Sequence, residues 1–209
     1  MSLKLAVVDY GAGNLRSVAK ALEHLGFPVQ VTHDADQILE ADGVILPGVG
    51  SSGSAMAALH ARGLVEPLRQ VVAGGTPFFG VCLGLQLLMD GSDEDPRPCL
   101  GVAPGWVRRF PPVEKVPHMG WNQVDLAGEH PVFKGVPSGS NFYFVHSYYA
   151  DPEDSSLVCG TTEYGVTFCS VLARDNLVAT QFHPEKSGPT GLQLYDNFVR
   201  LMVLERAKV

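Results

Sequence analysis

The chain has 209 residues, and its 15 Lys and Arg against 22 Asp and Glu give it a formal net charge of −7. This length is enough for one domain to bury a large hydrophobic core. An acidic chain without a run of Lys or Arg is a poor binder of nucleic acid, and 45% hydrophobic with 18% charged residues is typical of a globular protein rather than a disordered one.

Targeting and redox signals are sparse. No apolar run approaches the roughly 18 residues that a membrane span needs, and the first apolar stretch is too short for an export signal. The four cysteines form no C-x-x-C pair, so a zinc ribbon or a redox motif of that type is disfavoured. We therefore expect a cytoplasmic protein with free thiols, no membrane contact and one domain spanning residues 1–209.

The first half of the chain alternates short apolar runs with helical patterns. Residues 15–25, for example, carry hydrophobic side chains at a helical spacing and are followed by Gly26. Such alternation indicates β-α-β units and a parallel sheet with helices on both faces. The expected strands are 3–8, 29–32, 43–46 and 77–81, and the expected helices are 15–25, 55–61, 64–73 and 83–89.

The second half begins with a polar loop over residues 91–98 and then contains mainly strand-like segments. The short turns between them favour antiparallel pairing. The fold class is therefore α/β, with a mostly parallel central sheet, helices on both faces and antiparallel strands in the second half. The expected strands are 102–110, 123–126, 142–149, 157–162, 167–173 and 177–182, followed by an amphipathic helix over 191–206.

The segment Gly80-Val81-Cys82-Leu83-Gly84 lies between an expected strand and an expected helix. Its form, G-x-C-x-G, is the thiol version of a nucleophile elbow, in which flanking glycines relieve the clashes of a tight turn. The N-terminus of the following helix favours a thiolate. Cys82 is therefore a candidate nucleophile, although a core cysteine between two packing glycines has the same local pattern.

A second candidate segment, His183-Pro184-Glu185, directly follows the last expected strand. Proline pushes the residue before it into an extended conformation, and in an extended segment residues two apart point to the same face. A thiol nucleophile needs an imidazole partner, and that ring needs a carboxylate to orient it. His183 and Glu185 therefore complete a predicted triad with Cys82, although alone the segment is equally typical of an exposed turn.

The loop Pro47-Gly48-Val49-Gly50 follows the third expected strand. Its glycines allow backbone N–H groups to approach a ligand, as an oxyanion hole requires. Gly48, Gly50 and Gly53 also fit a dinucleotide fingerprint, but the acidic residue expected near the end of the next strand is absent, and Cys82 stands there. His118 and His146 have no second ligand at a zinc-like spacing. We expect no metal and no cofactor.

Together, the glycine loop, the elbow cysteine and His-Pro-Glu resemble the class I (triad) glutamine amidotransferases, in the order typical of that family. The resemblance covers essentially the whole chain and implies a flavodoxin-like fold. Longer strings resemble the glutaminase subunits of imidazole glycerol phosphate synthases, which act in histidine biosynthesis. These strings are Asp9–Ser17, Val116-Pro117-His118-Met119-Gly120-Trp121-Asn122, Tyr143-Phe144-Val145-His146-Ser147-Tyr148 and His183-Pro184-Glu185-Lys186-Ser187.

The resemblance assigns roles to individual residues. Cys82 would attack the side-chain amide of L-glutamine and form a glutamyl thioester, while His183 transfers protons and Glu185 orients His183. Backbone N–H groups of Gly50 and Leu83 would form the oxyanion hole. The substrate-binding residues would be Gln86, Glu94, Ser147 and Tyr148, and the partner-facing residues would be Trp121, Tyr143 and Lys186.

The resemblance also implies a partner, a separate (β/α)8-barrel cyclase subunit that forms a heterodimer with this chain. That cyclase would use the ammonia to make imidazole glycerol phosphate and an aminoimidazole carboxamide ribotide. Two alternatives remain open from the residues: a glutaminase subunit for another synthase, such as one feeding anthranilate or aminodeoxychorismate synthesis, and a thiol peptidase or deglycase of similar α/β form. A non-catalytic binding module is disfavoured by the intact triad.

Overall fold

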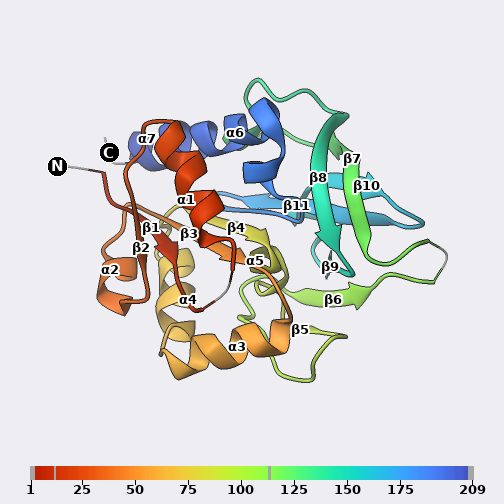
Figure 1. The fold of residues 1–209 in the computed structure, drawn as a ribbon, viewed down its shortest axis with the longest axis horizontal. Helices are drawn as coiled ribbons and strands as arrows, with labels where there is room; N and C mark the ends of the chain where they lie inside the picture. Colours follow the sequence, from red (N-terminus) through yellow and green to blue (C-terminus); the bar gives the residue numbers. More distant parts are fainter. Residues whose placement is uncertain (1–2, 12, 113, 207–209) are drawn as a thin grey trace.

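The computed structural model describes residues 3–11, 13–112 and 114–206, and a mixed sheet of twelve strands runs through this part of the chain (Figure 1). The main strand order is β2-β1-β3-β4-β12-β11-β10-β7-β8. The strands are β1 (Leu5–Val8), β2 (Val29–Thr32), β3 (Gly43–Gly48), β4 (Phe78–Cys82), β5 (Gly91–Ser92), β6 (Gly105–Arg109), β7 (His118–Leu126), β8 (Ser140–His146), β9 (Tyr148–Pro152), β10 (Val158–Glu163), β11 (Thr167–Arg174) and β12 (Leu177–Thr180).

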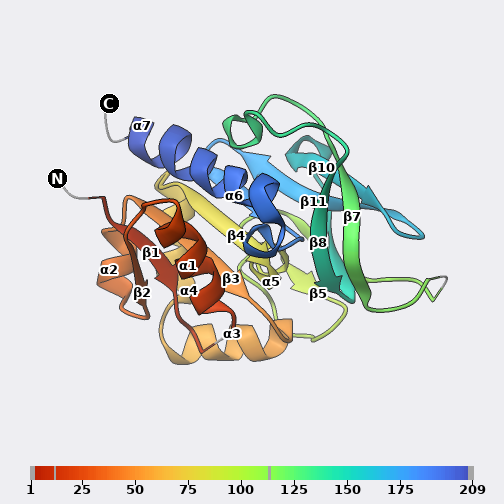
Figure 2. The ribbon, with the colours of Figure 1, turned by 45° about the horizontal axis from the view of Figure 1, so that its top comes forward.

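Five neighbouring strands, β2, β1, β3, β4 and β12, pair in parallel and form the centre of the fold. Helices cover both faces of this part of the sheet (Figures 1 and 2). The predicted α/β class, with a mostly parallel central sheet and antiparallel strands in the second half, is confirmed. The helices are α1 (Leu15–His24), α2 (Ala35–Leu39), α3 (Ser52–Ala61), α4 (Val65–Ala73), α5 (Leu83–Gln86), α6 (Gly188–Asn197) and α7 (Leu204–Arg206), with a π-helical segment (Phe198–Val203) between the last two.

Two hydrophobic cores lie on opposite faces of the parallel strands. Successive strand side chains point to opposite faces, so Val44 packs in one core and its neighbour Ile45 in the other. The first core lies against α2, α3 and α4, and includes Met56 and Leu68. The second lies against α1, α6 and the π-helical segment, and includes Phe198. Packing on both faces restrains the parallel strands, and with them the loops that follow the carboxyl ends of these strands.

The second half of the chain differs from the sequence prediction at two strands. The first is β5, whose two residues pair with β6 although residues 91–98 were expected to form a loop. Residues 142–149 were expected to form a single strand, but the structure divides them between β8 and β9, with Ser147 between the two. The strands then separate, because β8 pairs with β7 whereas β9 pairs with β6 and β11. An alternating hydrophobic pattern specifies a strand but not its partners, so the pattern did not show this break.

Other differences concern one additional helix and the ends of helices and strands. Helix α2 was not expected; it has only five residues with one buried side chain, Ile38, and begins where Asp34 accepts hydrogen bonds from two backbone N–H groups. Strand β7 begins at His118, earlier than residue 123, and the last helix begins at Gly188, earlier than residue 191. None of the helices in the described ranges has the length and apolar character needed to cross a membrane.

Helix α5 is shorter than the expected helix over residues 83–89. After Leu87 the backbone tightens, because the N–H groups of Leu88 and Met89 donate three residues back, to the carbonyls of Leu85 and Gln86. The α-helical pattern therefore ends after one turn. The carbonyls of Leu87, Leu88 and Met89 accept from backbone N–H groups of residues 100–103, which hold the segment that follows the helix.

Two glycines allow β4 and α5 to pack closely against their neighbours. A Cβ atom on Gly84 would overlap the carbonyl oxygen of Leu46 on β3, and one on Gly80 would lie 3.0 Å from Ala179 Cβ on β12. The glycines that flank Cys82 therefore satisfy a packing requirement of the elbow.

The variant Gly84→Ala is expected to lower the free energy of unfolding by at least about 3 kcal/mol, because backbone must move to accept the methyl group. The control is Gly63→Ala, where no atom lies within 4 Å and the cost of about 1 kcal/mol comes from its positive φ. Chemical denaturation of both variants measures the difference. Equal losses would show that the contact with Leu46 relaxes freely.

Candidate active site

Cys82 occupies a strained turn at the carboxyl end of β4. Its φ of 55° and ψ of −105° lie outside the regions that L-residues normally adopt. Helix α5 begins at the next residue, so Cys82 stands between strand and helix as the elbow pattern predicts. In the register of β3 with β4, Gly48 lies opposite Cys82, which places the glycine loop beside the thiol.

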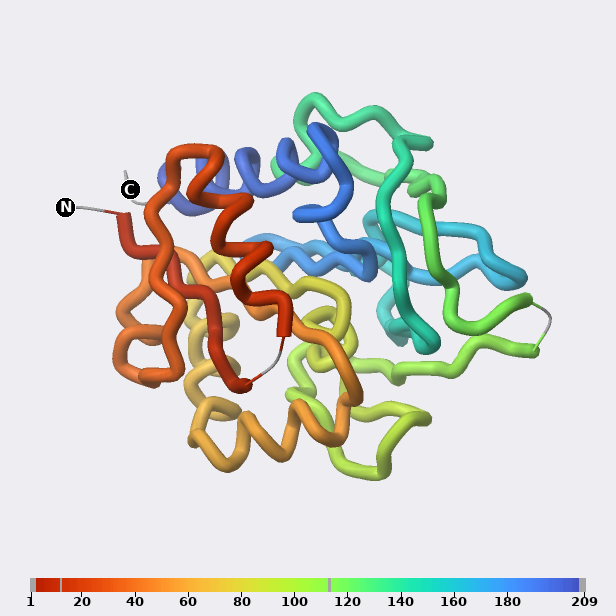
Figure 3. The backbone as a smooth tube through the Cα atoms, viewed as in Figure 1, coloured from red at the N-terminus to blue at the C-terminus, as the bar shows by residue number. Residues whose placement is uncertain are grey.

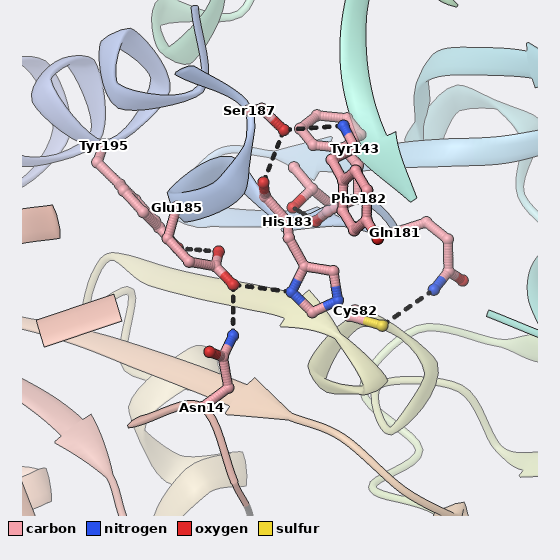
Figure 4. Close-up of polar contacts among 10 residues, drawn as sticks. Asn14, Cys82, Tyr143, Gln181, Phe182, His183, Glu185, Ser187 and Tyr195 are labelled. Carbon is pink, nitrogen blue, oxygen red and sulfur yellow. Dashed lines mark hydrogen bonds and ion pairs between the residues drawn. The ribbon is translucent and has the colours of Figure 1, made fainter. Parts of the chain in front are cut away.

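His183 reaches the same sheet edge from the other side of β4. Strand β12 runs parallel to β4, with Thr180 opposite Val81, so the residues after both strands emerge together (Figure 3). The His183 backbone is held by its N–H, which donates to the Tyr143 carbonyl at 3.0 Å, and by its carbonyl, which accepts from Ser187 Oγ at 2.7 Å. Figure 4 shows the imidazole ring of His183 next to the side chain of Cys82.

Glu185 orients this ring. His183 Nδ1 and Glu185 Oε1 lie 2.8 Å apart, and both side chains are almost completely buried. The sequence predicted that an extended tripeptide would bring these two side chains together, but the structure forms the contact in another way. Only His183 is extended, and Pro184–Lys186 forms a turn of 3₁₀ helix (η3). Proline begins this turn because its fixed φ suits the first helical position, and the turn folds the carboxylate back toward the ring.

Two further side chains hold the carboxylate in place. Asn14 Nδ2 donates to Glu185 Oε1, and the Tyr195 hydroxyl donates to Oε2 at 3.3 Å (Figure 4). Asn14 has a φ of 73°, a left-handed conformation that Asn tolerates better than most residues. Because Nδ1 of His183 is engaged by Glu185, the buried Nε2 is the ring atom left to face the sulfur, and it has no other hydrogen-bond partner among the described residues.

The electrostatics of the pair favour a charged ring and a charged carboxylate. Burial disfavours the charged form of His183, but its interactions with Cys82 and Glu185 outweigh burial and raise the pKa of the ring to about 9. Burial likewise opposes the charge of Glu185, but hydrogen bonding and attraction from His183, with a contribution from Asn14, lower the pKa of this carboxyl. An imidazolium ion at neutral pH is suited to stabilise a nearby thiolate.

A pocket of about 340 Å³ opens in front of Cys82 and His183. Gly50 and Leu83, the predicted oxyanion-hole residues, lie on its wall. Gly50 has a φ of 95° with open space around it, so only glycine adopts this conformation without strain. The pocket brings together the thiol, the ring and the predicted substrate-binding residues Gln86, Glu94, Ser147 and Tyr148.

The substrate-binding candidates already make contacts within the protein. Glu94 Oε2 accepts from the backbone N–H of Ser52 at 2.8 Å, at the start of α3. Gln86 Nε2 donates to the Tyr148 carbonyl at 2.8 Å. Ser147 links β8 to β9, and its carbonyl accepts from the Phe110 N–H. The Tyr148 carbonyl accepts a second hydrogen bond from His146 Nδ1, so both of its lone pairs are used, whereas the Ser147 carbonyl keeps one for a further donor.

The predicted partner-facing residues form one cluster beside the mouth of the pocket. Trp121 on β7 is 59% exposed, and its ring centroid lies 6.1 Å from that of Tyr143 on β8. Lys186 Nζ lies 5.9 Å from the centroid of the Tyr143 ring, and Lys186 also lines the pocket. We refer to Trp121, Tyr143 and Lys186 as the mouth cluster.

Comparison with known proteins identifies the family. The model of "Glutamine amidotransferase class-I" matches residues 6–202. The chain belongs to the class I glutamine amidotransferases. It is therefore an enzyme of a family that hydrolyses glutamine and transfers the ammonia, as the resemblance implied.

Individual relatives of this amidotransferase agree with that assignment. The chain is 48% identical over 198 residues to "Imidazole glycerol phosphate synthase subunit HisH" of Dehalococcoides mccartyi, covering 94% of this chain and 97% of that protein. It is 51% identical over 199 residues to the protein of the same name from Moorella thermoacetica, covering 95% of each. Among solved structures, PurLQS from Thermotoga maritima has the same fold, with a TM-score of 0.75, 19% identity and coverage of 96% and 99%.

Sequence reasoning missed several residues that this amidotransferase places around its thiol. Gln181 Nε2 lies 3.6 Å from Cys82 Sγ, and Asn14 and Tyr195 hold Glu185. Only Gln181 had a usable signal, since it stands two residues before His183 at the end of a strand. Asn14 lies in a string that the family resemblance included, but nothing local linked it to a carboxylate 171 positions away.

A metal site has no support within residues 3–11, 13–112 and 114–206, where no group of three or more His, Cys, Asp or Glu side chains is arranged to hold an ion. The expectation that the amidotransferase needs no metal and no cofactor stays a prediction.

Alkylation is expected to distinguish Cys82 from the other three thiols of this amidotransferase. Burial raises the pKa of Cys99 to about 11 and of Cys169 to about 12, and burial also raises the pKa of Cys159. These three are therefore protonated and slow to react at pH 7.5, whereas Cys82 lines the pocket beside His183. Limiting iodoacetamide followed by mass mapping is expected to label Cys82 first. Preferential labelling of Cys159 would contradict an activated Cys82.

Proposed function

We propose that this chain is the glutaminase subunit of an imidazole glycerol phosphate synthase. It would hydrolyse L-glutamine to glutamate and ammonia, and pass the ammonia to a separate cyclase subunit. The observation that carries the proposal is the meeting of Cys82, His183 and Glu185 in one pocket, within a chain 48% and 51% identical to proteins that bear this subunit's name. We further propose that residues 1–209 form a single domain; a cytoplasmic location stays a prediction.

The geometry suits a thioester mechanism. Cys82 would attack the side-chain amide carbon of glutamine, and His183 Nε2 would give a proton to the departing ammonia. His183 would then take a proton from the water that hydrolyses the thioester. Glu185, bonded to Nδ1 at 2.8 Å, would keep Nε2 aimed at the reacting atoms and stabilise the positive ring.

Stabilisation of the oxyanion would come from the backbone. Leu83 is the first residue of α5, so its N–H points out of the helix beside the sulfur with no intrahelical acceptor. Gly50 lines the same pocket and would supply the second N–H. Gln86, Glu94, Ser147 and Tyr148 would hold the rest of the glutamine molecule.

A partner is needed because of the chemistry of ammonia. In neutral water ammonia becomes ammonium and loses the lone pair that a synthase uses, so it must travel by a dry path. We infer that a (β/α)8-barrel cyclase subunit docks on the mouth cluster and forms a heterodimer with this chain. Exposed Trp121 and Met119, at 59% and 62% exposure, give β7 an apolar surface next to the pocket.

The alternatives differ in what they turn over. A thiol peptidase or deglycase would act on peptides or sugar adducts and need no cyclase. A glutaminase subunit for another synthase would also hydrolyse glutamine, but a different synthase subunit would activate it. The near full-length match to subunits of imidazole glycerol phosphate synthase favours the first proposal over both.

Replacing the thiol separates the two half-reactions. The variant Cys82→Ala is expected to lose glutamine hydrolysis by roughly 10⁴-fold or more, because the nucleophile is gone. With the cyclase and added ammonium salt, the same variant is expected to support formation of imidazole glycerol phosphate at the wild-type rate. Cys159→Ala serves as the matched control and is expected to keep both activities. Retained glutaminase in Cys82→Ala would refute the assignment of the nucleophile.

Removing the exposed tryptophan tests the docking site. Trp121→Ala is expected to weaken binding of the cyclase by roughly 30-fold or more, as truncation of a central aromatic anchor does in protein interfaces. The control Val31→Ala changes an exposed side chain on β2, at the far end of the sheet, and is expected to bind normally. Titration calorimetry with the purified cyclase measures both affinities. Unchanged binding by Trp121→Ala would place the interface elsewhere.

A further inference from the structure

The side chain of Gln181 lies against the sulfur of Cys82. Its Nε2 is 3.6 Å from Sγ, and the residue is fully buried (Figure 4). Strand register explains the contact, because Thr180 pairs with Val81 and the next residue of each strand therefore emerges side by side. Gln181 thus takes its place from the same strand pairing that brings His183 to Cys82.

The neighbouring contacts determine which end of the amide faces the sulfur. Gln86 Nε2 donates to Gln181 Oε1 at 3.1 Å and to the Tyr148 carbonyl at 2.8 Å, so both of its hydrogens are used. If the Gln181 amide were rotated, two NH₂ groups would face each other and an oxygen would face the sulfur. Only the observed orientation satisfies these buried groups, and it directs an N–H donor at Cys82.

This orientation is supported by a longer chain of hydrogen bonds. The Tyr148 carbonyl also accepts from His146 Nδ1 at 2.8 Å, and His146 Nε2 lies 2.9 Å from His118 Nδ1. His118 Nε2 in turn lies 3.2 Å from Asn122 Nδ2 on the partner-facing strand β7. A carbonyl can only accept, so each imidazole donates from Nδ1 and accepts at Nε2.

The imidazoles of His118 and His146 in this series of hydrogen bonds are neutral at physiological pH. Burial lowers the pKa of His118 to about 4 and that of His146 to about 3. A neutral ring has one donor and one acceptor, which is what the chain requires. The polarity of every link between β7 and Gln181 is therefore fixed.

From this geometry we propose that Gln181 is a further residue of the reaction, whose amide N–H stabilises the Cys82 sulfur whenever it carries negative charge. The inference rests on the proposed function, with Cys82 as nucleophile. Two stages create that charge: the thiolate before attack, and the sulfur that leaves when the thioester is hydrolysed. In the second, water adds to the thioester carbon and gives its proton to His183, the C–S bond breaks, and its electron pair stays on sulfur as glutamate forms.

A hydrogen bond to a charged acceptor is roughly twice as strong as one between neutral groups, so the contact acts mainly on the anion. The titratable groups that interact most directly with the sulfur are His183 and Tyr10, and Glu185 and His146 in turn interact with His183. Glu94, Tyr148 and Lys186 line the same pocket. Of these, His183 attracts the thiolate but must also give up and accept protons. A neutral amide donor stays in place through every stage of the reaction.

The test compares Gln181→Met, which keeps the size of the side chain without the donor, with Gln181→Glu, which keeps the acceptor for Gln86 but puts negative charge beside the sulfur. The measurement is the rate of Cys82 alkylation by iodoacetamide against pH in the intact chain, with no glutamine present. In Gln181→Met we expect the profile to move to higher pH and the rate at pH 7 to fall about tenfold. Gln181→Glu is expected to move it further, because like charges repel.

Steady-state glutaminase assays with the cyclase give a second readout. The Gln181→Met variant is expected to lower kcat by about tenfold with little change in KM, since the donor acts on the reacting sulfur rather than on bound glutamine. The matched control is Gln70→Met on the exposed face of α4, which is expected to behave as wild type. Thermal unfolding checks that the variants are folded. If Gln181→Met does not fold, Gln181→Glu alone is used for the test.

The outcomes separate the two proposals. A wild-type chain that does not hydrolyse glutamine with the cyclase would overturn the proposed function. An active wild type with alkylation profiles unchanged in both Gln181 variants would overturn the role of Gln181 alone. If Gln181→Met and Gln181→Glu lost the same share of kcat and neither moved the pH profile of Cys82 alkylation, the proposed role would also be overturned. Gln181 would then be a packing residue.

Discussion

The parallel pairing of β4 with β12 is the contact on which the active site depends. These strands are neighbours in the sheet although about a hundred positions separate them in the chain, and Thr180 opposite Val81 sets their register. Because parallel strands end at the same edge, Cys82 and His183 emerge together. A shift of one residue would turn every side chain of β12 to the opposite face of the sheet. The two cores on either side of the sheet are what hold this register.

Within that frame, the reactive groups are held by buried hydrogen bonds rather than by loops alone. Glu185 contacts His183, Asn14 and Tyr195, so the carboxylate comes into place only when α1, η3 and α6 are packed together. Buried polar groups are costly unless they are satisfied, and this network satisfies the carboxylate almost completely. In this network of His183, Glu185, Asn14 and Tyr195, the buried Nε2 of His183 has no hydrogen-bond partner among the described residues, and it lies where the proposed reaction needs a free proton site.

The antiparallel half of the sheet contributes to both the pocket and the proposed docking surface. Strands β7 and β8 carry Trp121 and Tyr143 of the mouth cluster, and η3 carries Lys186. The end of β8 and the start of β9 form a wall of the pocket. The break at Ser147 makes this possible, because it lets one stretch of chain leave β7 and join β6 and β11. The pocket and the proposed docking surface thus lie on the same few strands, and the hydrogen-bonded side chains of His118 and His146 connect them.

The sequence alone determined the chemistry and the fold class. The elbow around Cys82, the His-Pro-Glu segment and the glycine loop are local patterns, and each depends on backbone rules that act over a few residues. The α/β alternation follows from hydrophobic periodicity for the same reason. What only the tertiary structure decided is pairing: that β12 lies parallel to β4, that residues 142–149 serve two different strands, and that Gln181 reaches the sulfur. Periodicity encodes which face of a strand is buried but not which strand lies beside it, because that choice comes from long-range packing of the whole core.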